Sequence, residues 1–150
     1  MVITLMTYAQ TRKDAPHARI YASWVELATW RALSHPARSL LTAMLAHYRK
    51  GNNGIVKWPC SRIAMALDVS RDTASRLLKE LEANGWIKPV TLGTFGGAAK
   101  AGTFALTMWP NDADHSPATN DYLYISPYLA KKPRSKLKRP LSDLKDSSVR

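Results

Sequence analysis

The chain has only one cysteine, Cys60, among its 150 residues. A single cysteine excludes an intramolecular disulfide and a cysteine-rich zinc site, and it is the usage expected in a reducing cytoplasm. Long apolar runs are also missing: the opening MVITLMTYAQ is apolar for only about six residues and has no basic leading segment. We therefore expect neither a secretory signal nor a membrane span, and a cytoplasmic location.

Residues that could form a catalytic or metal site are few and scattered. The four histidines are His17, His35, His47 and His115. None of them forms a close pair with a carboxylate or with Cys60, and the chain has no GxGxxG or P-loop motif. The glycine-rich GTFGG at residues 93–97 lacks the lysine of a phosphate-binding loop. We expect no enzyme activity, no catalytic residue, no metal, no cofactor and no small-molecule ligand.

Acidic residues are scarce, with 11 Asp and Glu against 22 Lys and Arg, so the net charge is +11. Residues 131–150 hold eight of the basic side chains and two of the acidic ones. Such an excess implies a polyanionic partner, either nucleic acid or an anionic membrane surface. The membrane is the weaker alternative, because Pro133 and Pro140 interrupt any long amphipathic helix in this segment. We expect residues 131–150 to be a disordered basic tail.

The most informative segment is SRIAMALDVSRDTASRLLKELEANGWI, residues 61–87. Ser61 is expected to cap a first helix, Asp68-Val69 to form a tight turn, and Ser70 to cap a second helix. Asn84-Gly85 would end that second helix in a left-handed C-cap. The inward faces are predicted to be Ile63, Ala64 and Leu67 in the first helix and Ala74, Leu77, Leu78 and Leu81 in the second.

The flanking patterns complete a small domain at residues 20–110. A short helical pattern covers 24–33, and Ser34 with Pro36 begins a helix that carries to Gly51. Strands are expected at 55–58, 86–92 and 103–109, with a glycine-rich loop at 93–102. Residues 1–19 are expected to be a loose arm with a short strand at 2–6. Residues 111–130, with an aromatic patch at 122–128, would pack back on the domain.

Helix, strand, helix, helix, strand, loop and strand follow one another in the order of a winged helix-turn-helix, a mainly α fold with a small β-hairpin. LDVSRDTASRLLKELEANGWI resembles the DNA-reading segment of many small bacterial winged helix-turn-helix regulators, in which a glycine often stands at the place of Asp68. A wider stretch, TWRALSHPARSLLTAML, NNGIVKWPCSRIAMAL and FALTMWPNDADHSPATNDY, resembles plasmid, prophage and integrative-element proteins over residues 21–125. The resemblance implies a nucleoid-associated protein that binds double-stranded DNA as a regulator or accessory factor of a mobile element.

A helix presented in this way fits the major groove. The candidate DNA-binding residues are Arg62, Ser70, Arg71, Thr73, Ser75, Arg76, Lys79 and Lys100. Arg76 is expected to read a base, Arg62, Arg71 and Lys79 to meet phosphates, and the loop with Lys100 to lie along a phosphate ridge or enter the minor groove.

Two other functions stay open, a protein-interaction adaptor built on the same fold and a plasmid replication initiator. A homodimer is also open, although no dimerisation helix is evident. The five tryptophans could stack on single-stranded bases, but their places at element boundaries favour core packing.

Overall fold

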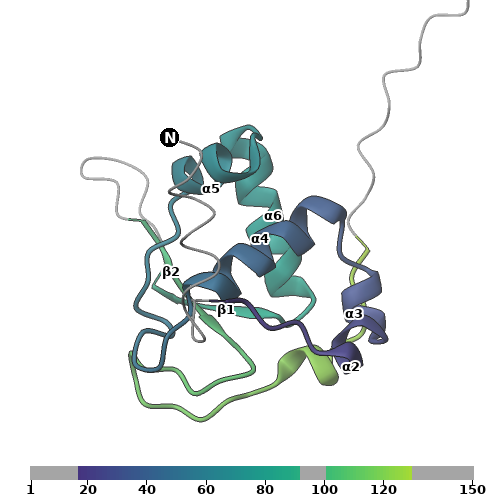
Figure 1. Cartoon of the computed structure of the whole chain (residues 1–150), viewed down its shortest axis with the longest axis vertical. Helices are drawn as coiled ribbons and strands as arrows, with labels where there is room; N and C mark the ends of the chain where they lie inside the picture. Colours follow the sequence, from purple (N-terminus) through teal and green to yellow (C-terminus); the bar gives the residue numbers. More distant parts are fainter. Residues whose placement is uncertain (1–16, 92–100, 130–150) are drawn as a thin grey trace, which may run out of the picture.

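The computed structural model describes residues 17–91 and 101–129. Within these ranges it has five α-helices, one 3-10 helix and a two-stranded antiparallel hairpin (Figure 1). The elements are α2 (Ala22–Val25), α3 (Ala28–Arg31), α4 (His35–His47), α5 (Cys60–Leu67), α6 (Arg71–Ala83), β1 (Ile87–Thr91), β2 (Thr103–Leu106) and η1 (Asp121–Leu123). Helices combined with a small antiparallel hairpin are what the sequence predicts. The predicted strand at 2–6, residues 93–100 of the predicted loop at 93–102, with Lys100, and the predicted tail at 131–150 lie outside the described residues.

The first long helix, α4, begins as predicted and ends early. The hydroxyl of Ser34 accepts a hydrogen bond from the N–H of Ala37 at 3.3 Å, and Pro36 occupies the first turn. The prediction that the helix continues to Gly51 is wrong, because the backbone becomes extended at Tyr48, with ψ at 135°. This departure places the Tyr48 ring in a stack on Trp109, with the ring centroids 4.1 Å apart.

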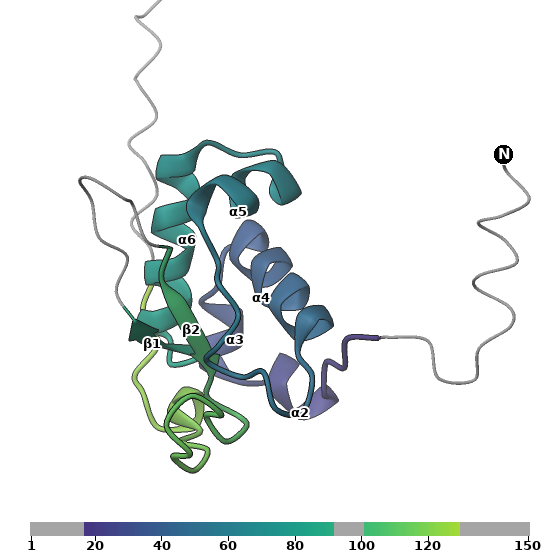
Figure 2. The same cartoon turned by 90° about the vertical axis from the view of Figure 1, so that its left-hand side faces the viewer.

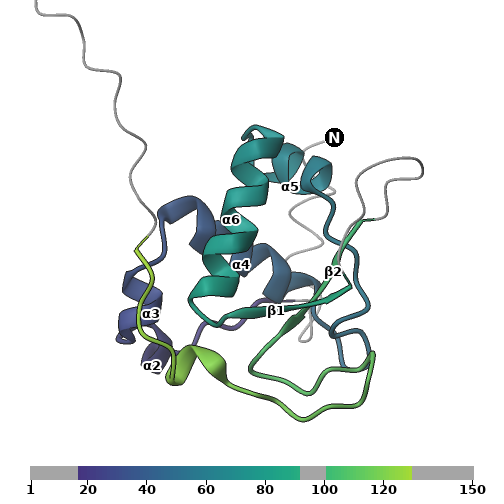
Figure 3. The same ribbon diagram turned by 180° about the vertical axis from the view of Figure 1, so that it is seen from behind.

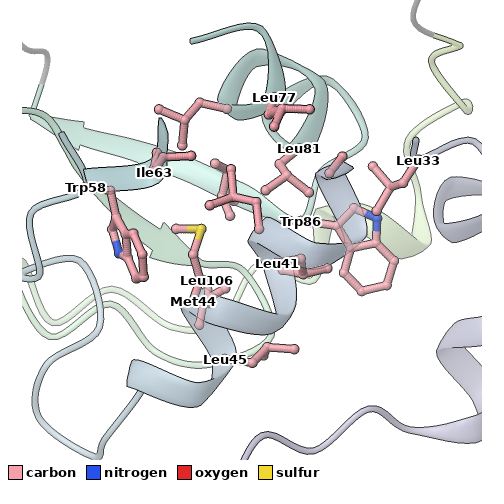
Figure 4. Close-up of a cluster of buried hydrophobic side chains, with 14 of the residues drawn as sticks. Leu33, Leu41, Met44, Leu45, Trp58, Ile63, Leu77, Leu81, Trp86 and Leu106 are labelled. Atoms are coloured by element: carbon pink, nitrogen blue, oxygen red, sulfur yellow. The ribbon is translucent and has the colours of Figure 1, made fainter. Parts of the chain in front are cut away.

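Helix α6 has the caps and the buried face that the sequence predicts. The hydroxyl of Ser70 accepts from the N–H of Thr73 at 3.1 Å, and the chain leaves the helix at Gly85, where φ is +76°. Its four predicted core residues are all buried: Ala74, Leu77, Leu78 and Leu81. They pack with the buried leucines of α4 and with Ile63, Trp86 and Leu106 into one core (Figure 4).

Helix α5 starts two residues earlier than predicted. Pro59 stands at its N-cap with no side-chain cap, so the prediction that Ser61 caps the helix is wrong. The carbonyl of Pro59 accepts from the N–H groups of both Arg62 and Ile63, and the fixed φ of proline suits this place. Ile63 is buried as predicted, whereas Ala64 and Leu67 are only partly buried against the core.

The predicted helical segment at 24–33 is split into α2 and α3 by an extended residue, Leu27. Six residues advance a continuous helix by about 600°, which would place Trp24 and Trp30 on different sides. The break allows both indole rings to meet Trp86 edge to face, each with a centroid distance of 5.6 Å. Trp24, Trp30, Trp58 and Trp86 are buried, as core packing requires.

The hairpin is shorter than predicted because the side chain of Asn53 bonds the backbone of Leu106, where the ladder of strand hydrogen bonds would otherwise continue. Ile87 in β1 lies opposite Leu106 in β2, and β2 ends there instead of at Trp109. The Leu106 N–H donates to Oδ1 of Asn53 at 2.7 Å, and its carbonyl accepts from Nδ2 of Asn53 at 2.9 Å. The predicted strand at 55–58 is reduced to a bridge between Lys57 and Thr103, since Pro59 has no N–H to continue a ladder.

The segment after the hairpin returns to the C-terminal end of α6. Tyr122 is buried and stacks on Trp86 with a centroid distance of 4.4 Å, while its carbonyl accepts from the hydroxyl of Thr29 at 2.8 Å. Burial raises the pKa of the Tyr122 hydroxyl above its ordinary value. Further along, the amide of Asn84 pairs with the backbone N–H and carbonyl of Tyr128, at 2.8 and 3.0 Å. Residues 121–128 are thereby fixed beside α2, α3 and α6.

Candidate nucleic-acid interface

A tight turn sets the angle between α5 and α6. Asp68 ends α5 in the left-handed conformation, with φ at +53° and ψ at 52°, and the N–H of Val69 donates to the carbonyl of Ala64 at 3.0 Å. Glycine adopts this conformation most easily and aspartate is among the few other residues that tolerate it. Asp68 and Val69 link the two helices, and the side chain of the next residue, Ser70, caps α6. The turn lies at the end of the molecule away from α2 and η1 (Figures 1 and 2).

One face of α6 is free of other elements. Residues of an α-helix advance by 100°, so the side chains opposite the buried stripe are those at 72, 75, 76, 79 and 83. Arg76 and Lys79 are exposed near the middle of this face, and Arg71 is exposed at its edge. Seen from behind, α6 lies in front of α4 (Figure 3). The face is long enough to present its basic side chains to a single partner surface.

Three of the predicted site residues are joined by hydrogen bonds at the start of α6. Nη2 of Arg76 donates to the hydroxyl of Thr73 at 3.1 Å, and the hydroxyl of Ser70 donates to the same Thr73 oxygen at 2.9 Å. The Thr73 hydroxyl thus accepts twice and keeps its own proton for an external acceptor. The bond also directs the Arg76 guanidinium toward the N-terminal end of the helix. Because the side chain is already restricted, it loses less conformational entropy on binding a partner.

Arg62 is held elsewhere. Its guanidinium lies over the ring of Trp58, 4.4 Å from the centroid, and Nη1 donates to the carbonyl of Lys57 at 3.2 Å. The structure therefore does not bring Arg62 together with the α6 side chains. A phosphate contact at this position would use the donors that the contact with Lys57 leaves free.

The remaining predicted residues differ in their surroundings. Arg71 and Lys79 are exposed and make no hydrogen bond or ion pair within residues 17–91 and 101–129. Ser75 is partly buried beside them, and Lys100 lies outside the described residues. The basic part of the face is therefore formed by Arg71, Lys79 and Arg76, of which Arg76 is hydrogen-bonded to Thr73.

Two exposed residues of α5 and α6 are not among the predicted site residues. Asp72 is exposed in the first turn of α6, one turn before Arg76. Its spacing from Arg76 and Lys79 follows the i, i+4, i+7 pattern of a single face, which could have identified it. Met65 on α5 is the most exposed large apolar side chain of the described residues, at 86%. Its place between Ala64 and Ala66 gives no comparable sequence signal.

Other kinds of site find little support in the described part of the chain. No group of three or more His, Cys, Asp or Glu side chains lies close enough there to hold a metal ion. None of its helices is both long and apolar enough to cross a bilayer. Comparison with family models, with curated proteins and with solved structures finds no match to this chain. Functional inference therefore depends on the chemistry of the α6 face itself.

Proposed function

We propose that the chain is a winged helix-turn-helix protein that binds double-stranded DNA and places α6 in the major groove. In this proposal α5, the turn at Asp68 and α6 form the helix-turn-helix, and β1 and β2 flank the wing. The protein acts as a transcriptional regulator or accessory factor of a mobile element. The observation that carries the proposal is the exposed basic face of α6, opposite a face that is buried along its length.

The dimensions and chemistry of this face suit a groove. A helix of 13 residues is about 20 Å long, and the major groove is about 12 Å wide and admits one helix. Arg76 can donate two hydrogen bonds to a guanine, and the Thr73 hydroxyl can donate to a phosphate oxygen or to a base edge. In this proposal Arg71 and Lys79 supply charge to backbone phosphates. The left-handed Asp68 also gives a physical reason for the glycine that stands at this place in the proteins it resembles.

A protein-interaction adaptor is the second candidate, and two observations favour it. Met65 is exposed on α5, and Asp72 places a negative charge on the α6 face. A negative charge repels phosphate, and an exposed methionine is typical of protein-binding surfaces. The adaptor and the DNA-binding protein differ in what salt does to their binding.

Salt dependence with a random duplex tests the proposal. If the domain and the tail neutralise about six phosphates, log K should fall against log salt with a slope of about −5. Deletion of residues 131–150 should reduce the slope and leave any sequence preference unchanged, since a charged tail meets phosphates and not base edges. Selection from a random duplex library would then give the preferred site. An affinity for duplex DNA that does not change with salt favours the adaptor.

A further inference from the structure

Arg76 has two potential partners one turn before it on α6, and it contacts only one of them. Its Nη2 donates to the hydroxyl oxygen of Thr73, three residues earlier, at 3.1 Å. Asp72 lies four residues earlier, which is the spacing and order at which an acidic side chain pairs with an arginine on a helix. Within residues 17–91 and 101–129, however, the one ion pair joins Arg31 to Glu26, and the Asp72 carboxylate has no partner. Arg76 therefore makes the neutral contact in place of the charged one.

Asp72 is the carboxylate on α6 that is free to compete for Arg76. The other acidic residue four positions from Arg76 is Glu80, and its two oxygens accept from the N–H and the hydroxyl of Ser34. Around the helix axis Asp72 lies about 40° to one side of Arg76, and Thr73 lies about 60° to the other. A guanidinium released from Thr73 and paired with Asp72 would thus point to the opposite side of the exposed face.

The Thr73 oxygen is itself held in place by the cap of α6. The Ser70 hydroxyl donates to this oxygen at 2.9 Å, and the Thr73 N–H donates to the Ser70 oxygen at 3.1 Å. Together, Ser70 and Arg76 fill the two lone pairs of the Thr73 oxygen. An exposed ion pair gains little free energy in water, so a fixed neutral acceptor can outcompete Asp72 for the guanidinium.

The contact with Thr73 leaves a complete pair of donors on Arg76. A guanidinium has five N–H groups and two edges, each of which can donate two parallel hydrogen bonds. Nη2 has one N–H group on each edge, so the single bond to Thr73 engages only one edge. The other edge keeps both donors, and two parallel donors are what bind O6 and N7 of a guanine.

We infer that Thr73 is a positioning residue, which holds Arg76 away from Asp72 and directs its free edge to one guanine. The inference rests on the proposed DNA binding by α6. Thr73 acts through Arg76, so its hydroxyl determines the base preference at the Arg76 contact and leaves the phosphate contacts unaffected. Without that hydroxyl, Arg76 turns to Asp72 and the preference for guanine declines.

The experiment measures discrimination, defined as the ratio of affinities for the selected duplex and for the duplex with the guanine contacted by Arg76 replaced. Fluorescence anisotropy with the full chain gives both affinities. Thr73→Val should lower the ratio at least about fivefold, the lower end of what a paired contact with guanine contributes. The slope of log K against log salt should stay the same, because no phosphate contact is lost. Thr73→Ser keeps the hydroxyl and should keep the ratio.

Thr42→Val is the matched control, since Thr42 is also a partly buried threonine on a helix but lies on α4. It should change neither the ratio nor the slope. Thermal midpoints without DNA show whether each variant is folded. Thr73→Ala also lacks the hydroxyl and has a higher helix propensity, so it provides the same test if Thr73→Val does not fold.

Asp72→Ala distinguishes positioning from a direct contact between Thr73 and DNA, because it removes the competing acceptor. Discrimination by the double variant Asp72→Ala with Thr73→Val should be within about threefold of that by Asp72→Ala alone, the remainder being lost order of Arg76. In an Arg76→Ala background, Thr73→Val should lower discrimination no further. A direct contact of Thr73 predicts the full loss in both backgrounds.

Equal discrimination by the parent and Thr73→Val overturns the inference, and so does a loss that persists in the Asp72→Ala or Arg76→Ala background. These results leave the proposed function intact, because the parent still binds and discriminates duplexes. A parent that binds no duplex, or binds it independently of salt, contradicts the proposed function itself, and the inference fails with it.

Discussion

The carboxylate of Glu80 on α6 accepts hydrogen bonds from both the backbone N–H and the hydroxyl of Ser34 at the start of α4. The bond from the Ser34 hydroxyl to Oε2 is 3.0 Å long, and the N–H donates to Oε1. Glu80 is buried, and its charge lies at the positive end of the α4 dipole. One residue therefore satisfies the first turn of α4 and fixes α6 against it, which sets the direction of the exposed basic face.

Glu80→Ala should lower the free energy of unfolding by about 1 to 3 kcal/mol, because the partly buried N–H and hydroxyl of Ser34 would lose their acceptor. Chemical denaturation monitored by circular dichroism measures the loss. Glu82→Ala is the control on the same helix, since Glu82 is exposed, and it should change stability by less than about 0.5 kcal/mol. Equal losses in the two variants would show that the Ser34 contact adds nothing.

Gly85→Ala should destabilise the protein by more than about 2 kcal/mol. A Cβ atom at this position would lie 2.6 Å from the backbone nitrogen of Tyr122 and 2.7 Å from the carbonyl carbon of Asp121, in addition to the strain at φ +76°. Gly51→Ala separates the two effects, because Gly51 also has positive φ but has open space around it. Thermal melts of both variants give the comparison. If Gly51→Ala lowers the thermal stability as much as Gly85→Ala does, then the close approach of residues 121 and 122 does not contribute to the loss.

The parts of the fold that the sequence predicts well are those specified within one helix. The cap at Ser70, the stripe of Ala74 and the three leucines, and the stop at Gly85 involve residues at most a few turns apart. Two of the failures, the cap of α5 and the strand at 55–58, come from the neighbouring Pro59, and others depend on distant residues. The end of β2 depends on Asn53, which is 53 residues away, and the split between α2 and α3 depends on Trp86. No local pattern contains that information.

The candidate site is also only partly predictable, for a different reason. Positions on the circumference of α6 follow from spacing, so the exposure of Arg71, Arg76 and Lys79 is predictable. The direction of a long side chain is not, because it depends on whichever acceptor or ring lies nearby. Arg62 turns onto Trp58, and Arg76 turns toward Thr73. Whether the candidate residues bind DNA is a prediction that the following measurements address.

Arg76→Ala and Lys79→Ala should differ in kind. Arg76 stands near the middle of the exposed face, so its loss should cost about 1 to 3 kcal/mol on the preferred site and relax preference at one base pair. Lys79→Ala should weaken binding to all duplexes about equally, because the lost contact is to a phosphate and carries no sequence information. Competition binding on a panel of single-base variants distinguishes the two outcomes. Site preference that is unchanged in Arg76→Ala would remove Arg76 from the role of base reader.

Asp72→Asn should strengthen DNA binding by about threefold at low salt. Two unit charges about 7 Å apart in water interact by about 0.6 kcal/mol, and the substitution removes a repulsion of this size between the α6 face and phosphate. Fluorescence anisotropy with a labelled duplex measures the change. For a protein-binding adaptor the carboxylate has no phosphate to repel, so weaker or equal duplex binding in Asp72→Asn would count against the groove placement.

The most direct test of the account replaces Arg71, Arg76 and Lys79 together with alanine and measures affinity for the selected duplex by fluorescence anisotropy. All three side chains are exposed, so the variant should keep the thermal midpoint of the parent. The account predicts a loss of at least about 100-fold, because one base contact and two phosphate contacts disappear at once. A folded triple variant that binds every duplex with the affinity of the parent would contradict the claim that α6 is the DNA-reading helix.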